Sequence, residues 1–223
     1  MGNERIGFSF LQDPRNVCLQ GLNSWLVRRV IEVPRLRHLW FRSSQELLFR
    51  TDAIEVYVEK VEVFRQLLLI AIYLLGGQPA RTTEVLSLRY INTSYGGIRN
   101  IFIQHKMVCL LFLYHKGYNH SGQVKVVHRY LPRELGDLLV RYLAVVLPFC
   151  QQIQLGQGSD WELSPFIWDK CLVRRTTSPT EDDCKAKLWS SDKMRRILQE
   201  EAVRHLGTEL NISSWRHIAI SIR

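Results

Sequence analysis

A run of nine apolar residues, Leu67 to Leu75, constrains the fold more than any other feature of this sequence. A helix needs roughly 20 residues to cross a bilayer, so this run is about half long enough and predicts a buried helical segment instead. We expect Asp52 to be the N-cap of a helix that continues to Leu75. Gly76 and Gly77 supply the left-handed backbone that ends helices, and Pro79 prevents continuation. The end of this helix should therefore lie in the centre of the core.

The rest of the pattern predicts further helices around a small antiparallel sheet. Alternation of apolar and polar residues indicates strands, and helical periodicity between capping residues, glycines and prolines indicates helices. Strands are expected at 100–105, 107–115 and 123–130. Helices are expected from Ala80 or Arg81 to before Asn92, over 133–147 with Pro148 closing the helix, from Ser190 or Ser191 to Gly207, and from about Ser213 onward. The predicted fold class is α+β, mostly α.

The two ends of this pattern suggest a division of the chain. Helical pieces broken at Pro14 and Pro34 form a basic annex over residues 1–60, with arginines between the apolar positions of its second piece. The core is expected over 61–223, with a loop-rich insertion at about 151–188 where the sequence turns polar. A chain of 223 residues has room for one large domain with such an annex.

Composition points to a folded protein with an anionic partner. The 46% of hydrophobic and 23% of charged residues exclude a disordered chain. The net charge of +9 favours a polyanion, most simply nucleic acid, although proteins that lie on anionic membranes are basic too. The first residues have neither the basic start nor the apolar stretch of a secretory signal, so we expect an intracellular protein without a membrane segment.

Neither a metal site nor another cofactor is expected. The five cysteines form no CxxC pair and are odd in number, which argues against a zinc ribbon and against a secreted disulfide framework. We expect reduced thiols, several of them in the core. No G-x-x-x-x-G-K-[ST] phosphate loop occurs, so the chain contains no ATP-driven motor.

Three basic residues stand at unusual places: Arg81 at a helix start after the buried helix, Lys116 in a hairpin turn, and Arg216 inside the last helix. Each alone would be taken as a solvated charge. Together, and in this order, they resemble the active-site layout of the tyrosine recombinases, the integrase and Xer-like family of DNA strand-transfer enzymes.

The resemblance covers about 64–222 and rests on three blocks. Residues 77–88, GQPARTTEVLSL, look like the family block T-G-x-R-x-x-E-x-L-x-L with two extra residues before the arginine, which places Arg81 on the first catalytic arginine and Glu84 on the acidic residue that supports the site. Lys116 matches the lysine of the family's β-hairpin. Residues 212–217, ISSWRH, look like the block H-x-x-R-H, with Arg216 as the second arginine followed by His217. Ser213 stands where the family has a histidine.

The resemblance implies chemistry at a DNA phosphodiester without a metal ion. Two forked guanidinium groups, those of Arg81 and Arg216, would hold the non-bridging oxygens on which negative charge builds. Lys116 would protonate the departing 5′ oxygen, and His217 would add a donor to the phosphate. The family's nucleophile is a tyrosine beyond the second arginine, whereas all eight tyrosines here precede Arg216. As given, the chain is therefore expected to bind and polarise a phosphate without forming a phosphotyrosyl link, either as a piece of a longer polypeptide or as a degenerate copy.

The amino-acid sequences of these blocks most resemble recombinase-like regions of fungal Crypton-type transposable elements. Regions of this kind also stand upstream of RecQ-type helicases in large fungal proteins. This resemblance implies a nuclear protein that binds duplex DNA, with self-association on DNA and a fused or partner helicase as further possibilities. One alternative is a non-catalytic DNA-binding or regulatory module, either on its own or as part of a larger helicase-containing protein. Another is a helical protein-interaction domain in which Arg81, Glu84 and Arg216 form a buried ion-pair network.

Overall fold

The computed structural model describes residues 4–43, 48–114, 125–155, 161–170, 173–175 and 188–222. The helices in these ranges are α1 (Trp25–Glu32), α2 (Pro34–Trp40), α3 (Thr51–Leu75), α4 (Thr82–Leu86), α6 (Arg133–Arg141), α7 (Leu147–Leu155), α9 (Ser191–Leu206) and α10 (Ile212–Ser221). The strands are β1 (Ile101–Gln104), β2 (Met107–Tyr114), β3 (Lys125–Tyr130), β4 (Trp161–Leu163) and β5 (Val173–Arg175). Three short 3-10 helices precede α1, at Phe10–Gln12, Val17–Leu19 and Leu22–Ser24.

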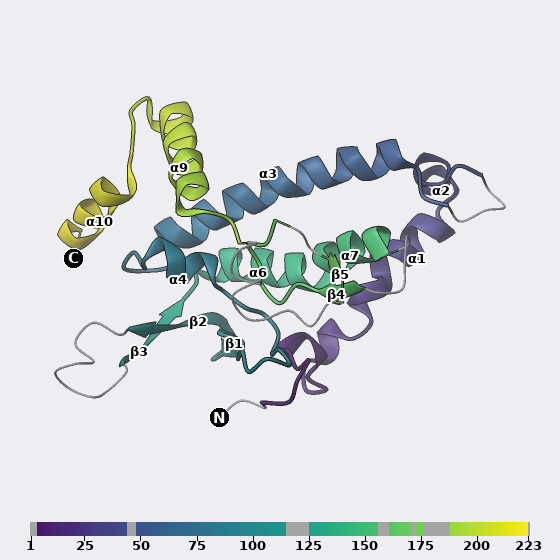
Figure 1. The fold of residues 1–223 in the computed structure, drawn as a ribbon, viewed down its shortest axis with the longest axis horizontal. Coiled ribbons are helices and arrows are strands. Elements are labelled where there is room, and N and C mark those ends of the chain that lie inside the picture. The colour runs from purple at the N-terminus through teal and green to yellow at the C-terminus, as the bar shows by residue number, and fades with distance from the viewer. Residues whose placement is uncertain are drawn as a thin grey trace.

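The predicted fold class is confirmed: the chain is mostly helical, with one small three-stranded antiparallel sheet (Figure 1). The strands follow the order β1-β2-β3, and their bounds agree with the prediction to within two residues wherever they are described. His105 and Lys106 join β1 to β2 with φ values of 52° and 63°. Positive φ at both central residues is typical of the two-residue turns that match the twist of antiparallel strands. In the register, Ile101 pairs with Leu110, and Leu110 pairs with Arg129.

Helix α3 forms the long axis of the fold, and one face of its C-terminal half is buried (Figure 1). The prediction that the whole run from Leu67 to Leu75 is buried is wrong, because these two end residues are 45% and 57% exposed on the other face of the helix. Leu69 is fully buried and Tyr73 is only 2% exposed. Gly77 takes the expected left-handed backbone, with φ of 86°. The prediction that Asp52 is the N-cap is wrong: Arg50 occupies that position, and Asp52 lies in the first turn. There the Asp52 carboxylate accepts hydrogen bonds from the Arg50 guanidinium, which competes with the backbone N–H groups for it.

The prediction that Pro148 closes a helix is also wrong. A π-helical turn, Tyr142–Val146, follows α6 and leads directly into α7, in which Pro148 is the second residue. Inside a regular α-helix the proline ring clashes with the carbonyl four residues earlier, and the wider π turn relieves this conflict. Leu147 and Phe149 are buried on either side of the proline, which favours the continued helix. The expected loop-rich insertion therefore begins later than residue 151, and residues 156–160, 171–172 and 176–187 of it lie outside the described residues.

Helix α9 has the capping residues that the sequence indicates, whereas α10 begins at Ile212, one residue before the expected start, with a cap that was not predicted. Ser190 accepts a hydrogen bond from the Lys193 N–H at 3.1 Å, and Gly207, with φ of 68°, ends α9. Asn211 caps α10 by accepting from the Ser214 N–H at 2.8 Å. Helix α9 packs against α3 and α4, so these two elements fix the base from which α10 extends (Figure 1).

The N-terminal segment packs on the rest of the chain through a second apolar cluster. Val30 of α1 and Phe41 join Phe149 and Ile153 of α7 there. The outward positions of α1 and α2 are basic as expected, since Arg28 and Arg35 are exposed. Helix α3 runs through the expected boundary at residue 60, so the annex and the core share this helix.

A buried arginine joins three separate parts of the chain. Arg65 of α3 is 3% exposed, and its Nη2 donates to the backbone oxygens of Ile167 at 2.7 Å and Asp169 at 2.6 Å. Its Nη1 donates to Glu62 Oε2 at 3.1 Å. Its guanidinium also lies 4.7 Å from the ring centre of Trp189, next to the start of α9. Arg65 therefore holds α3, the 164–169 segment and the base of α9 together.

The cysteines that the structure describes are all free thiols: Cys18 is exposed, and Cys109 and Cys150 are buried. Burial raises the pKa of the Cys150 thiol to about 12. Within the described ranges, no group of three or more His, Cys, Asp or Glu side chains is arranged to hold a metal ion. None of the helices in these ranges combines the length and the apolar character that crossing a membrane requires.

Candidate functional site

Arg81 and Glu84 lie together at the start of α4, directly after the turn that ends α3. Glu84 Oε2 accepts the backbone N–H of Arg81 at 3.0 Å, which satisfies one of the donors that a helix start leaves open. Glu84 Oε1 lies 3.9 Å from Arg81 Nε. The Arg81 side chain is 54% exposed, so its guanidinium is accessible to a ligand from solvent. Glu84 therefore fixes the backbone of Arg81 and lies beside its charge without burying it.

Arg216 reaches the same place from the other end of the sequence. Its Nη2 donates to the backbone oxygen of Ala80 at 3.1 Å, across 136 residues of sequence. Trp215, the preceding residue, packs against the main core, and this contact fixes the face of α10 that turns inward. Because Ala80 immediately precedes Arg81, the structure brings together the two arginines that the sequence singled out.

The other predicted site residues are not brought into this cluster. Lys116 lies outside the described residues. His217 is exposed on α10, and in the described part of the chain no hydrogen bond or ion pair joins its ring to Arg81, Glu84 or Arg216. Ser213 is exposed in the first turn of α10.

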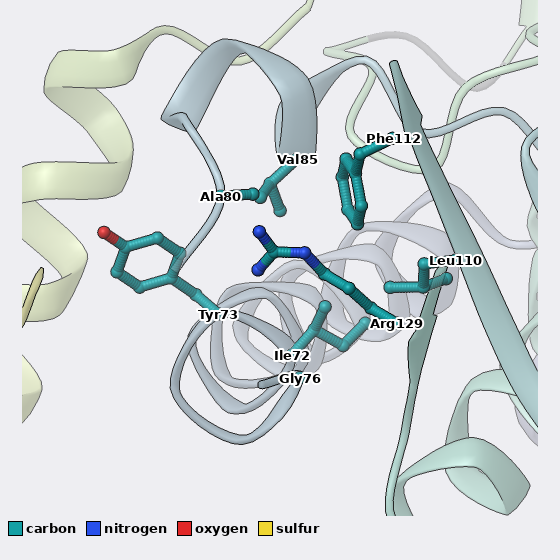
Figure 2. A pocket seen from close by; sticks show the side chains of 8 residues that line it. All are labelled: Ile72, Tyr73, Gly76, Ala80, Val85, Leu110, Phe112 and Arg129. Atoms are coloured by element: carbon teal, nitrogen blue, oxygen red, sulfur yellow. The ribbon is translucent and has the colours of Figure 1, made fainter. Parts of the chain in front are cut away.

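Sequence reasoning missed a third arginine at this site, Arg129 of β3. Arg129 pairs with Leu110 in the sheet, so it is on the face of β3 that meets the helices, the same face as Val127. Figure 2 shows its guanidinium extending between the end of α3 and Ala80, with the Tyr73 ring on one side and the Phe112 ring on the other. The guanidinium carbon lies 5.0 Å from the centre of the Phe112 ring. The signal that could have identified it is an arginine on the apolar face of an alternating strand.

Arg129 borders a cavity of about 10 Å³ between α3, α4 and the sheet (Figure 2). This is about the room that one water molecule needs. Its other walls are formed by apolar and aromatic residues and one glycine: Ile72, Tyr73, Gly76, Ala80, Val85, Leu110 and Phe112. Arg129 Nε is buried, and no hydrogen-bond acceptor for it occurs among the described residues.

Electrostatic effects connect Arg129 with the rest of the cluster. The pKa of Arg129 is lowered, and burial is the largest cause. The positive charge of Arg216 lowers this pKa further, whereas the negative charges of Glu84 and of ionised Tyr73 raise it. Burial raises the pKa of Tyr73, while Arg216 and Arg129 pull it back. The Tyr73 hydroxyl points away from the Arg129 guanidinium (Figure 2), and a hydrogen bond with Arg216 is among the effects that lower its pKa. Tyr73 is therefore a neutral side chain beside two cations.

The charges of the cluster do not balance. Among the described residues, Glu84 lies beside the Arg81 guanidinium and its charge acts on Arg129, while Arg216 adds a further positive charge next to Ala80, so the arginines here outnumber the acidic groups that the structure places beside them. Guanidinium groups present forked donors that match the oxygens of phosphates and carboxylates. The arrangement can therefore bind an oxyanion without a metal ion.

Comparison with known proteins does not identify this chain: no family model matches it, and no solved structure gives a significant match.

Proposed function

We propose that this chain is a DNA-binding domain of the tyrosine-recombinase type, which holds a DNA phosphodiester between Arg81 and Arg216. The observation that carries the proposal is the hydrogen bond from Arg216 to the Ala80 carbonyl, which brings the second arginine next to the first. The two residues were singled out by their motifs alone, and nothing in those motifs requires them to meet in space. The proposal places the protein in the nucleus, with duplex DNA as its partner.

The proposed roles follow from charge and exposure. Arg81 is exposed enough to meet a phosphate, and Arg216 is half-buried and fixed by Ala80. The two guanidinium groups would neutralise the negative charge that develops on the non-bridging oxygens of the phosphate during strand transfer. Lys116 keeps its proposed role as proton donor to the 5′ oxygen, and His217 its proposed role as an additional donor. The net charge of +9 and the exposed arginines of α1 and α2 favour a long contact with a polyanion.

A second candidate, a DNA-binding module without the reaction, is favoured by Ser213. A serine at the family's histidine position offers a shorter donor without a titrating ring. The third candidate, a protein-interaction domain with a buried ion-pair network, finds less support. The Arg81 side chain is 54% exposed and its nitrogen lies 3.9 Å from the Glu84 oxygen, which describes a surface pair.

Binding of a fluorescent duplex oligonucleotide, followed by anisotropy at several salt concentrations, tests the proposal. Each phosphate contact contributes about 0.9 to the slope of log K against log salt concentration. The double variant Arg81→Ala, Arg216→Ala should therefore bind more weakly and lose about 1.8 of this slope, with its melting temperature nearly unchanged.

The matched control is the double variant Arg195→Ala, Arg204→Ala on α9. Both side chains are more than half exposed and each forms only a surface pair, with Asp192 and Glu201, so the change in net charge is the same. Equal losses in both double variants would show that net charge alone drives binding. Absence of wild-type binding at low salt would refute the proposal.

Strand cleavage separates the first two candidates. The whole polypeptide, extended to include a downstream tyrosine if one follows, should nick or relax supercoiled DNA if the domain is catalytic. An intact supercoiled substrate together with tight binding would leave the non-catalytic module as the function.

A further inference from the structure

Arg129 occupies a position that is costly for a cation. It extends from the helix-facing side of β3, opposite Leu110, over the ring of Phe112. A charge removed from water destabilises the fold unless it is paired or fully hydrogen-bonded. Stacking on an aromatic ring recovers part of that cost but does not neutralise the charge.

The described part of the chain contains no dedicated counter-charge for Arg129. Glu84 is the one acid whose charge acts on it, and the Glu84 carboxylate is already bonded to the Arg81 backbone. Arg129 Nε is a buried donor without a hydrogen-bond partner in the described residues. An unsatisfied donor beside a small cavity is unusual, because buried polar groups are nearly always hydrogen-bonded.

The size of the cavity limits what can satisfy Arg129 Nε. With a volume of about 10 Å³, it admits one atom of the size of a water oxygen and excludes a whole phosphate group or a side chain. A single oxygen that projects from a larger group outside would fit. Arg216 donates a hydrogen bond to the backbone oxygen of Ala80, a residue of the cavity wall, so its guanidinium lies beside the place where the rest of that group would sit.

We propose that Arg129 is a third phosphate-binding residue, whose guanidinium receives one non-bridging oxygen of the DNA phosphate from the inner side of the site while Arg81 and Arg216 hold it from the outer side. The inference rests on the proposed function, since it assumes that the anion is a DNA phosphodiester. It adds an inner contact at a residue that none of the three sequence blocks contains.

Three variants test this role. Arg129→Met keeps the packing of the side-chain stem and removes the charge, and Arg129→Lys keeps the charge and removes the planar fork. Arg141→Met is the matched control, because Arg141 is exposed on α6 and the change in net charge is the same. Each variant is titrated with duplex DNA at several salt concentrations, and its melting temperature is measured without DNA.

The expected results differ for the two substitutions. Arg129→Met should weaken binding about tenfold or more and reduce the salt slope by about 0.9, as expected for one lost phosphate contact. Arg129→Lys should weaken binding while nearly keeping the slope, because the ammonium still releases a counterion but lacks the forked donors. Arg141→Met should change neither quantity by a comparable amount.

Other results would overturn the inference. If Arg129→Lys and Arg129→Met melt lower but bind DNA with the wild-type affinity and slope, Arg129 has only a structural role. Wild-type DNA binding that depends on Arg81 and Arg216 but not on Arg129 would refute this inference and leave the proposed function standing. Absence of wild-type DNA binding would refute both.

A further experiment distinguishes a DNA phosphate from free inorganic phosphate as the anion that Arg129 binds. Inorganic phosphate, added at constant ionic strength without DNA, should raise the melting temperature of the wild type by less than the duplex does, because the duplex contributes many contacts. If inorganic phosphate stabilises the wild type as much as duplex DNA does, and Arg129→Met abolishes this effect, the site binds free phosphate and the assignment to DNA is wrong.

Discussion

Replacement of Arg65 by methionine should strongly destabilise the fold, because this buried side chain of α3 bonds to three separate groups. The substitution keeps most of the side-chain stem and removes three donated hydrogen bonds, two to backbone oxygens and one to Glu62. Hydrogen bonds to charged groups contribute about 1.5 to 3 kcal/mol each, and removal of one partner of a buried charged pair costs about 3 to 5 kcal/mol. Arg65 Nε has no partner among the described residues, so its loss costs nothing further.

The expected loss of unfolding free energy for Arg65→Met is therefore about 3 to 5 kcal/mol. Arg65→Lys should lose less, since one ammonium keeps the charge but cannot span the oxygens of Ile167 and Asp169 in the same geometry. The assay is urea unfolding followed by far-UV circular dichroism, with Arg196→Met, an exposed position on α9, as the control. A loss below about 1 kcal/mol, the level of an ordinary exposed pair, would refute the reasoning.

Three smaller predictions concern packing, thiol reactivity and pH. Gly97→Ala should cost about 1 to 3 kcal/mol in urea unfolding, because the new Cβ would lie 1.7 Å from Nη1 of Arg89, which is itself buried; an unchanged stability would contradict this. Alkylation of the native protein, mapped by mass spectrometry, should modify exposed Cys18 and spare Cys150, whose thiol is buried with a pKa of about 12; equal labelling would contradict the packing of α7. A neighbouring arginine holds the pKa of Asp13 at about 2, below its usual value of 3.8, so this carboxylate stabilises the fold above about pH 4 and the contribution is lost as the pH falls toward 2. The stability difference between wild type and Asp13→Asn should shrink over that range, and a constant difference would refute the assignment.

Local signals predicted much of the fold because their physical causes are local. The alternating strands were located to within two residues, and Ser190 and Gly207 mark the ends of α9 through their own backbone and side-chain chemistry. Pro148 failed as a stop signal because its effect depends on the π turn that precedes it and on the burial of its neighbours. Neither condition can be inferred from the proline itself.

The site was predictable only where a motif marked it. Arg81 and Glu84 stand three residues apart, so their contact follows from helical geometry. The approach of Arg216 to Ala80 depends on how α9 packs on α3 and α4 and on how the chain turns from α9 into α10, which no local pattern determines. Arg129 was missed because a strand pattern rich in apolar residues does not indicate which cation faces the core until the register with Leu110 is known.

A double-mutant cycle on duplex binding tests the central claim, that Arg81 and Arg216 hold the same phosphate. Affinities are measured at one salt concentration for wild type, Arg81→Ala, Arg216→Ala and the double variant. Two groups that share one ligand are coupled, so the loss in the double variant should fall short of the sum of the single losses by at least about 0.5 kcal/mol. Losses that add to within about 0.3 kcal/mol would mean that the two arginines act at separate places, and the account of a shared phosphate site would be wrong.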